Sequence, residues 1–285
     1  MRASDIFRLV LLAAIWGGSF VFLRVVAPAL GAIVTADLRV LIAWAALAIY
    51  CRAAGIDMAW RRFWPQYLII GLFNAALPFV LFAFAAQHIP ASYSAILNAT
   101  SPFFGELFAG LWLGEKITWL KCFGFVFGIA GVALVTGVAP DRAGGVTSWA
   151  MAACLLAAVS YGFVSVYTKK FAAAANPRAI AAGCQLMAGL LLLPLVPFNL
   201  SAGPVTPFIA VNMILFALLS SGVAFLLYYR LIADIGPTKS LTVTFLMPVF
   251  TMIWAALFLG EAVTLVMIGG CALILAGTAL VVLRR

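Results

Sequence analysis

Long apolar runs separated by short connections restrict the fold of this chain more than any other feature. Ten stretches of about 20 residues are apolar enough to cross the hydrocarbon core of a bilayer, which is about 30 Å thick, as helices. They cover residues 6–26, 31–51, 65–86, 91–112, 117–137, 148–168, 178–198, 207–229, 236–258 and 263–283. No connection exceeds about 15 residues, so no separate soluble domain is expected. The sequence predicts an all-α polytopic membrane protein with ten transmembrane helices.

The composition agrees with lipid as the solvent. Charged residues make up 9% of the chain and hydrophobic residues 66%, whereas soluble proteins carry about 25% charged residues. The net charge of +9 is scattered between apolar runs, so no nucleic-acid partner is expected. The single histidine lies among no other ligand-type side chains, and the five cysteines form no C-x-x-C pair. We therefore expect no metal site, cofactor or disulfide framework.

The positions of Lys and Arg predict how the chain is oriented. With the N-terminus in the cytoplasm, 14 of the 17 basic residues, Lys121 among them, fall on the cytoplasmic side, in the connections or at the ends of the spans. Arg24 and Arg142 fall outside, and Arg39 lies within the second span. Because basic residues accumulate on the cytoplasmic side, both termini are predicted to be cytoplasmic.

An internal repeat divides the chain into two five-helix units. Shifting the sequence by 146 residues aligns 102–135 with 248–281 at 14 identical positions, and Gly114-Glu115 falls on Gly260-Glu261. We expect one unit at 1–137 and the other at 148–285. Five is an odd number, so the second unit enters the membrane from the opposite side. Inverted repeats around a central cavity are typical of alternating-access transporters.

Several motifs make the chain similar to a known family. They are Trp16-Gly17-Gly18-Ser19-Phe20 in the first span and the Pro-x11-Gly-Glu boxes at 102–115 and 248–261. With ten spans and two repeats, the chain resembles the EamA-type transporters of the drug/metabolite transporter superfamily. Among them it looks most similar to the YddG-type exporters of aromatic and other neutral amino acids. In one departure, Trp16 aligns near Ser160-Tyr161, so the first-span motif is not repeated.

The resemblance implies carriage of small metabolites through a central cavity lined mainly by helices 1, 3, 4, 6, 8 and 9, in a bacterial inner membrane. Polar and aromatic side chains at similar depth could bind a zwitterion head and an apolar side chain. The amides of Asn74 and Asn98 are favoured, because a buried amide needs more partners than a hydroxyl, which can simply tie helices together. The candidate cavity residues are Trp16, Ser19, Asn74, Pro78, Phe82, Asn98, Ser101, Tyr161, Ser165, Ser221, Tyr228 and Thr244.

Four residues are candidates for hinges or gates. Pro102 and Pro248 lie near the middle of spans four and nine, where a proline kinks a helix. Glu115 and Glu261 precede spans five and ten, where a carboxylate can cap the free N–H groups of the next helix. Glycines of these two spans are expected to form close-packing surfaces: Gly124, Gly128, Gly131, Gly270 and Gly277.

Intramembrane charge is confined to few positions. Arg39, with Asp37 nearby, lies about 12 Å from the outer end of span two at 1.5 Å per residue, and we favour a structural role for it. Glu106 is interpreted as the only other deep ionisable group. It could pair with Arg39, bind a substrate ammonium or exchange protons, and these alternatives stay open.

The leading hypothesis is a secondary transporter that exports neutral amino acids by alternating access. Alternatives are an exporter of drugs or other metabolites, including nucleotide sugars and phosphorylated substrates, and a non-transport intramembrane protein. Phosphate recognition would need several fixed basic residues in the cavity, and an enzyme would need a catalytic constellation at the midplane. Neither pattern is present, so the chain is not expected to be an enzyme. The expected partners are a small-molecule substrate and lipid; a homodimer is left open, and a single copy would suffice.

Overall fold

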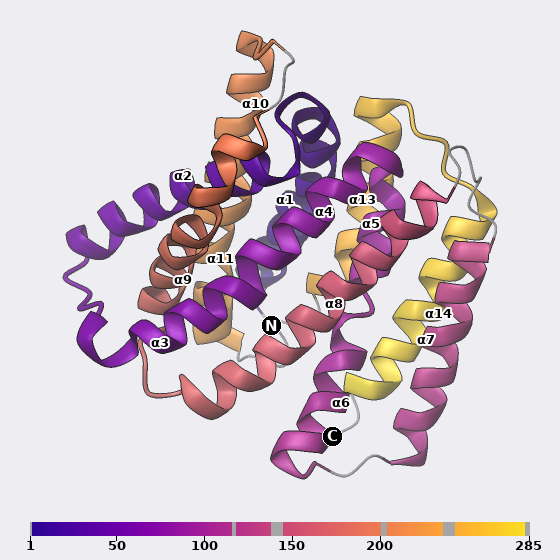
Figure 1. Cartoon of the computed structure of the whole chain (residues 1–285). Helices are drawn as coiled ribbons and strands as arrows, with labels where there is room; N and C mark the ends of the chain where they lie inside the picture. Colours follow the sequence, from indigo (N-terminus) through magenta and orange to yellow (C-terminus); the bar gives the residue numbers. More distant parts are fainter. Residues whose placement is uncertain (1, 116–117, 138–144, 201–203, 236–242, 283–285) are drawn as a thin grey trace.

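The computed structural model describes residues 2–115, 118–137, 145–200, 204–235 and 243–282. In this part of the chain every regular element is a helix (Figure 1). The first half contains α1 (Ala3–Leu30), α2 (Ala32–Ala53), α3 (Trp60–Gly71), the π-helical segment η1 (Leu72–Ala76), α4 (Leu77–His88), α5 (Ala91–Asn98), α6 (Ser101–Leu113) and α7 (Trp119–Gly137).

The second half follows the same order. It contains α8 (Val146–Phe171), α9 (Pro177–Leu192), the 3₁₀ segment η2 (Leu193–Phe198), α10 (Pro207–Ala217), the π-helical segment η3 (Leu218–Val223), α11 (Ala224–Ile235), α13 (Val243–Leu259) and α14 (Leu265–Val282). Both halves therefore carry a π-helical segment within their third apolar run.

Hydropathy predicted the apolar runs but not their interruptions. Within the described ranges, seven helical runs are long and apolar enough to cross a membrane, and α13 and α14 are shorter apolar helices. The predicted span 91–112 is divided into α5 and α6 at Ala99–Thr100. The predicted ninth span begins with residues 236–242, which lie outside the described residues. The all-helical membrane fold with ten apolar segments is confirmed.

Helices α7 and α14 lie side by side along their length (Figure 1). A Cβ added to Gly131 would lie 2.8 Å from the carbonyl oxygen of Gly270, and one added to Gly124 would lie 2.7 Å from that of Gly277. The two backbones approach so closely that only glycine fits at these positions. The expected close-packing surfaces of spans five and ten therefore pack against each other.

The other main contacts occur in matching pairs. Helix α1 packs against α13, and its counterpart α8 packs against α6; α2 packs against its own counterpart α9. The largest buried cluster joins residues of α1, α4, α5, α8 and α13 at the centre of this arrangement. The centre of the molecule is thus built by both halves.

The periphery exposes large apolar side chains. Trp119 of α7 and Leu265 of α14 are 85% and 86% exposed, and Leu257 of α13 is 68% exposed. Such exposure across many helices would favour association in water. In a bilayer these side chains contact lipid, as the hydropathy of the chain requires.

Candidate functional site

Two π-helical segments occupy equivalent positions in the two halves. The shift of 146 residues places η1, residues 72–76, on residues 218–222 of η3. A π-helical turn rearranges the local backbone hydrogen bonds and frequently marks a functional site. Paired interruptions in corresponding helices of a repeat also point to a binding site. The candidates Asn74 and Ser221 lie in these two segments, and Asn74 is half-buried.

Each π-helical segment is tied to the first helix of the opposite half. The hydroxyl of Ser160, on α8, donates to the carbonyl oxygen of Phe73 in η1 at 2.7 Å. The indole Nε1 of Trp16, on α1, donates to the carbonyl oxygen of Ser220 in η3 at 3.1 Å. Trp16 and Ser160 are the positions that align between the repeats, so different side chains make the same kind of contact. The first-span motif is absent from the second copy, but this contact is kept.

Arg39 of α2 reaches the second of these segments. Its side chain is buried, and its Nε donates to the hydroxyl of Ser221 at 3.0 Å. The guanidinium carbon lies 3.6 Å from the ring centroid of Phe79 and 4.4 Å from that of Phe216. Aromatic faces stabilise a desolvated cation by about 2 kcal/mol. Within the described part of the chain, the two terminal nitrogens of Arg39 make no hydrogen bond.

An unsatisfied polar oxygen and open space occur in the same region. The buried hydroxyl of Ser220, next to Ser221, has no hydrogen-bond partner among the described residues. Leaving such a group unpaired costs about 1–3 kcal/mol. A Cβ added to the buried Gly222 would meet no atom within 4 Å outside its own helix backbone. Segment η3 therefore has both an unsatisfied hydrogen-bonding group and room beside it.

Aromatic candidates from both halves gather near this polar group. The rings of Phe82 on α4 and Tyr161 on α8 have centroids 6.2 Å apart, and Phe82 lies 5.4 Å from Phe20. Tyr161 also packs against the buried cluster that contains Phe79. The ring of Trp16 lies 5.3 Å from that of Tyr228. The structure thus brings the predicted aromatic residues together as two pairs, each joining the two halves.

The predicted hinge at Pro102 differs from the structure. Helix α5 ends at Asn98, and Pro102 is the second residue of α6, so it begins a helix instead of kinking a continuous one. The hydroxyl of Ser101 donates to the carbonyl oxygen of Asn98 at 2.6 Å and lies 3.3 Å from its side-chain oxygen. Pro248 lies inside α13, as predicted. A proline lacks the N–H that would donate a hydrogen bond in the middle of a continuous helix. At Pro102 no such N–H is needed, because a new helix begins there.

The remaining candidates show no distinctive placement. The hydroxyl of Ser19 donates to the carbonyl of Trp16 in its own helix, and that of Ser165, an exposed residue, donates to the carbonyl of Gly162. Pro78 is buried in the first turn of α4, and Thr244 is half-buried at the start of α13. Binding roles for these residues stay predictions.

Glu106 has a buried basic partner. Its carboxylate Oε2 lies 2.5 Å from the Nζ of Lys121, and both side chains are buried, at 8% and 7% exposed. Lys121 was counted among the cytoplasmic charges at the start of the span 117–137, whereas the structure buries its side chain within α7. Glu106 is therefore not the only deep ionisable group besides Arg39, and it forms an ion pair with Lys121.

Glu261 caps a helix of the other half. Its Oε1 accepts from the backbone N–H of Ala91 at 2.9 Å, and its Oε2 lies 3.5 Å from that of Ser92, at the start of α5. The expectation that it caps the following helix was wrong: the Oγ1 of Thr264 accepts from Met267 N–H there, at 3.2 Å. Glu115 pairs with Lys169 at 3.0 Å. The residues that align with 91–92 under the repeat, 237–238, lie outside the described residues.

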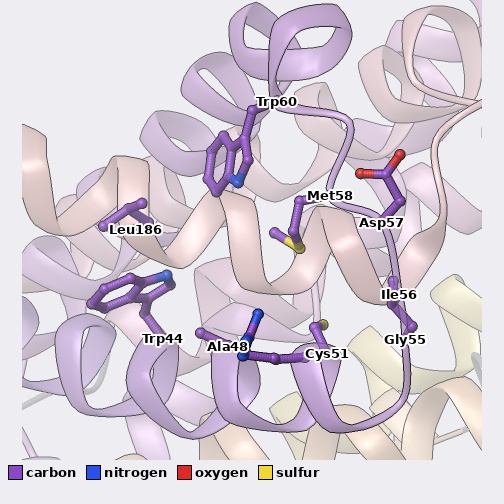
Figure 2. Close-up of a pocket in the computed structure, with 10 residues that line it drawn as sticks. Trp44, Ala48, Cys51, Gly55, Ile56, Asp57, Met58, Trp60 and Leu186 are labelled. Carbon is purple, nitrogen blue, oxygen red and sulfur yellow. The ribbon is translucent and has the colours of Figure 1, made fainter.

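A hollow of about 520 Å³ lies away from this central region, where α2 meets α3 (Figure 2). None of the predicted cavity residues lines it. The central region is built by the π-helical segments, Arg39 and the aromatic pairs, and we take it as the candidate site.

Comparison with known proteins yields matches along the whole chain. A model described as the EamA-like transporter family matches residues 4–137 and again residues 148–283. A Streptantibioticus cattleyicolor protein named probable terminal-alkyne amino-acid exporter is 28% identical over 281 residues, covering 98% of this chain and 93% of that protein. The Bacillus subtilis protein named uncharacterized transporter YvbV is 26% identical over 277 residues, covering 96% and 90%. A solved crystal structure matches 99% of this chain and 98% of its own chain with a TM-score of 0.68 at 20% identity, a likeness of fold alone.

Proposed function

This chain belongs to the EamA-like transporter family and is a multi-pass membrane transporter, and we propose that it exports neutral amino acids, aromatic ones included. Transport proceeds by alternating access between two inverted five-helix units, residues 1–137 and 148–285. One relative carries the name of an amino-acid exporter. For this chain, we base the proposed substrate class on the side chains of the central site.

Arg39 is the observation that carries this proposal. A buried guanidinium with one hydrogen bond, to Ser221, keeps two terminal nitrogens for a ligand. Their fork matches the two oxygens of a carboxylate. Phe79 and Phe216 hold the guanidinium in place and exclude water from its faces. We assign Arg39 to the substrate carboxylate, in place of the purely structural role that the sequence favoured.

The surroundings suit the rest of an amino acid. The hydroxyl of Ser220 has no partner within the described ranges and can bind a polar substrate atom. The rings of Phe82 and Tyr161 offer faces to an apolar side chain or to an ammonium group. Metals and cofactors have no part in this scheme.

The relation between the halves supports alternating access. The contacts of α1 with α13 and of α8 with α6 are counterparts under the repeat, and each first helix is tied to the π-helical segment of the other half. When the helices of one half move relative to those of the other, these hydrogen bonds move the π-helical segments with them. The site then opens to the opposite side of the membrane. A cysteine at position 203, predicted to lie outside the cytoplasm, should react with an impermeant reagent added externally. Reaction only from the cytoplasmic side would reverse the proposed orientation.

Counterflow in proteoliposomes tests the function. Vesicles loaded with unlabelled tryptophan, threonine or methionine should accumulate the labelled amino acid transiently, and chemically unchanged. Empty vesicles with the same protein provide the control. Saturable counterflow of neutral amino acids is expected, and the absence of competition by any amino acid would refute the substrate assignment.

A small anionic metabolite is the second candidate, because the terminal nitrogens of Arg39 would also bind a phosphate or a second carboxylate. Only one arginine is available in this site within the described residues, which favours a single carboxylate. Competition of amino-acid counterflow by dicarboxylates or sugar phosphates, at lower concentrations than by neutral amino acids, would favour this alternative.

A further inference from the structure

The hollow at the junction of α2 and α3 lies apart from the proposed transport site. Trp44, Ala48 and Cys51 follow one another along α2, and Trp60 lies across the opening (Figure 2). Leu186 of α9 contributes to its wall. The small side chain at residue 48 leaves the space that the two indole rings border. The hollow is therefore a recess bordered mainly by apolar side chains.

Three arginines line this hollow or the one next to it. Arg52 lines the hollow, and Arg61 and Arg62 line an adjoining one of about 360 Å³ that shares Asp57 and Trp60 with it. These arginines form no ion pair with an acidic residue in the part of the chain that the structure describes. The Oδ1 of Asp57 accepts from the backbone N–H of Ala59 at 2.8 Å. Three positive charges against one negative charge favour an anion.

The depth of the hollow matches an amphipathic ligand. Helix α2 has 22 residues, so at 1.5 Å per residue it is about 33 Å long, close to the hydrocarbon thickness of about 30 Å. Arg52 lies in its last turn, at the level of the headgroups. Trp44 precedes it by eight residues, about 12 Å deeper. Charge at the headgroup level with apolar walls below it is the pattern of a phospholipid.

We propose that this recess binds an anionic glycerophospholipid such as phosphatidylglycerol. Arg52 binds the phosphodiester, with Arg61 and Arg62 providing further positive potential, and one acyl chain lies along Trp44, Ala48 and Leu186. Basic pockets between transmembrane helices bind anionic headgroups in this way. The bound lipid joins α2 to α9 and to the connection before α3. The site is independent of the substrate assignment.

Native mass spectrometry of the purified full chain in detergent tests this site. Phosphatidylglycerol should be retained in preference to phosphatidylcholine and phosphatidylethanolamine, and glycerol 3-phosphate should not bind at the same concentration. R52Q should weaken phosphatidylglycerol binding about fivefold, the contribution of one basic residue near an anionic headgroup. A48F should abolish binding, because the ring fills the recess.

Two matched variants control for general effects. R2Q removes an exposed arginine at the start of α1, and A45F adds a ring at an exposed position of α2 outside the hollow; both should bind lipid within twofold of the parent. Thermal unfolding without lipid will show whether A48F is folded, and R52Q tests the headgroup contact if it is not. Unchanged binding in R52Q, or equal retention of phosphatidylcholine, would overturn the proposal. Equal binding of glycerol 3-phosphate would show an anion site without a lipid.

Discussion

Replacing Arg39 tests the proposed carboxylate contact directly. R39M removes the guanidinium that Phe79 and Phe216 enclose, and R39K keeps the charge without the planar fork. A hydrogen bond to a charged group contributes about 1.5–3 kcal/mol, which corresponds to a change of about 10- to 150-fold in affinity. R39M should raise the half-saturation concentration for a neutral amino acid by this factor, and R39K should raise it by less.

The assay is counterflow with two ligands, a neutral amino acid and the amine that lacks only its carboxylate. For the parent protein, the amine should compete weakly. In R39M the difference between the two ligands should disappear, because the group that distinguishes them is gone. S221A is the matched control: it removes the hydroxyl that accepts from Nε and should cost about 1 kcal/mol, roughly fivefold, with the preference for the amino acid retained.

A structural role for Arg39 predicts another result. If Arg39 only supported the fold, R39M would reduce the amount of active protein and leave the ratio of the two half-saturation concentrations unchanged. An unchanged ratio in folded R39M would refute the carboxylate assignment.

Four further predictions concern glycine packing, the buried ion pair, the open space beside η3 and the capping of α5 by Glu261. G17A and G162A should each lower the free energy of unfolding by about 1–3 kcal/mol. The added Cβ would lie 2.9 Å from the carbonyl oxygen of Met247 in G17A, and 2.6 Å from the backbone nitrogen of Gly105 in G162A. G269A is the control and should change this free energy little, because its Cβ would meet only Leu134, at 3.6 Å. K121M should lower the free energy of unfolding by about 3–5 kcal/mol, because it removes the buried cation whose Nζ lies 2.5 Å from the Glu106 carboxylate. E106L combined with K121M should recover most of the loss. Thermal unfolding in detergent measures both variants, and a K121M protein as stable as the parent would contradict the pairing. G222L should fill the open space beside η3 and reduce counterflow at unchanged thermal stability, whereas equal transport would place the substrate elsewhere. E261A should lower stability by about 1 kcal/mol, and protection of the Ala91 and Ser92 amides from hydrogen exchange should fall with it; unaltered exchange would show that the carboxylate is not their acceptor.

The apolar runs and the duplication were predictable because each depends on local composition. A stretch that spans a bilayer must make its backbone hydrogen bonds internally, as a helix does. The glycines of α7 and α14 recur at aligned positions of the two repeats, and this recurrence indicated their packing role. The pairing of these two helices follows from the same residues, since Gly124 and Gly131 meet Gly277 and Gly270.

The π-helical segments were not predictable in the same way. The side chains that donate hydrogen bonds to carbonyl oxygens of these segments, Ser160 and Trp16, come from the opposite half of the chain. Neither segment contains a proline that would mark it. The polar residues Asn74 and Ser221 within apolar runs were the available signal, and they were interpreted as single polar groups instead of as paired interruptions.

Two errors over charged residues share a physical cause. Lys121 was counted among the cytoplasmic charges because a lysine near the end of an apolar run ordinarily reaches the interface. Its buried carboxylate partner, 15 residues earlier in the chain, instead holds it within the bundle. Glu261 was expected to cap the nearest helix, but the free N–H groups that it satisfies belong to α5, 170 residues away. Both contacts depend on tertiary neighbours that local spacing does not identify.

Accessibility of a cysteine at position 220 tests the central claim most directly. Ser220 lies in η3, and its hydroxyl has no partner among the described residues, so S220C in a protein without its five native cysteines should leave the fold unchanged and place a thiol in the site. An impermeant thiol reagent should react with this cysteine from either side of the membrane, and a saturating neutral amino acid should slow both reactions. Reaction from one side only, or no protection by any amino acid, would contradict an alternating-access site between the two halves.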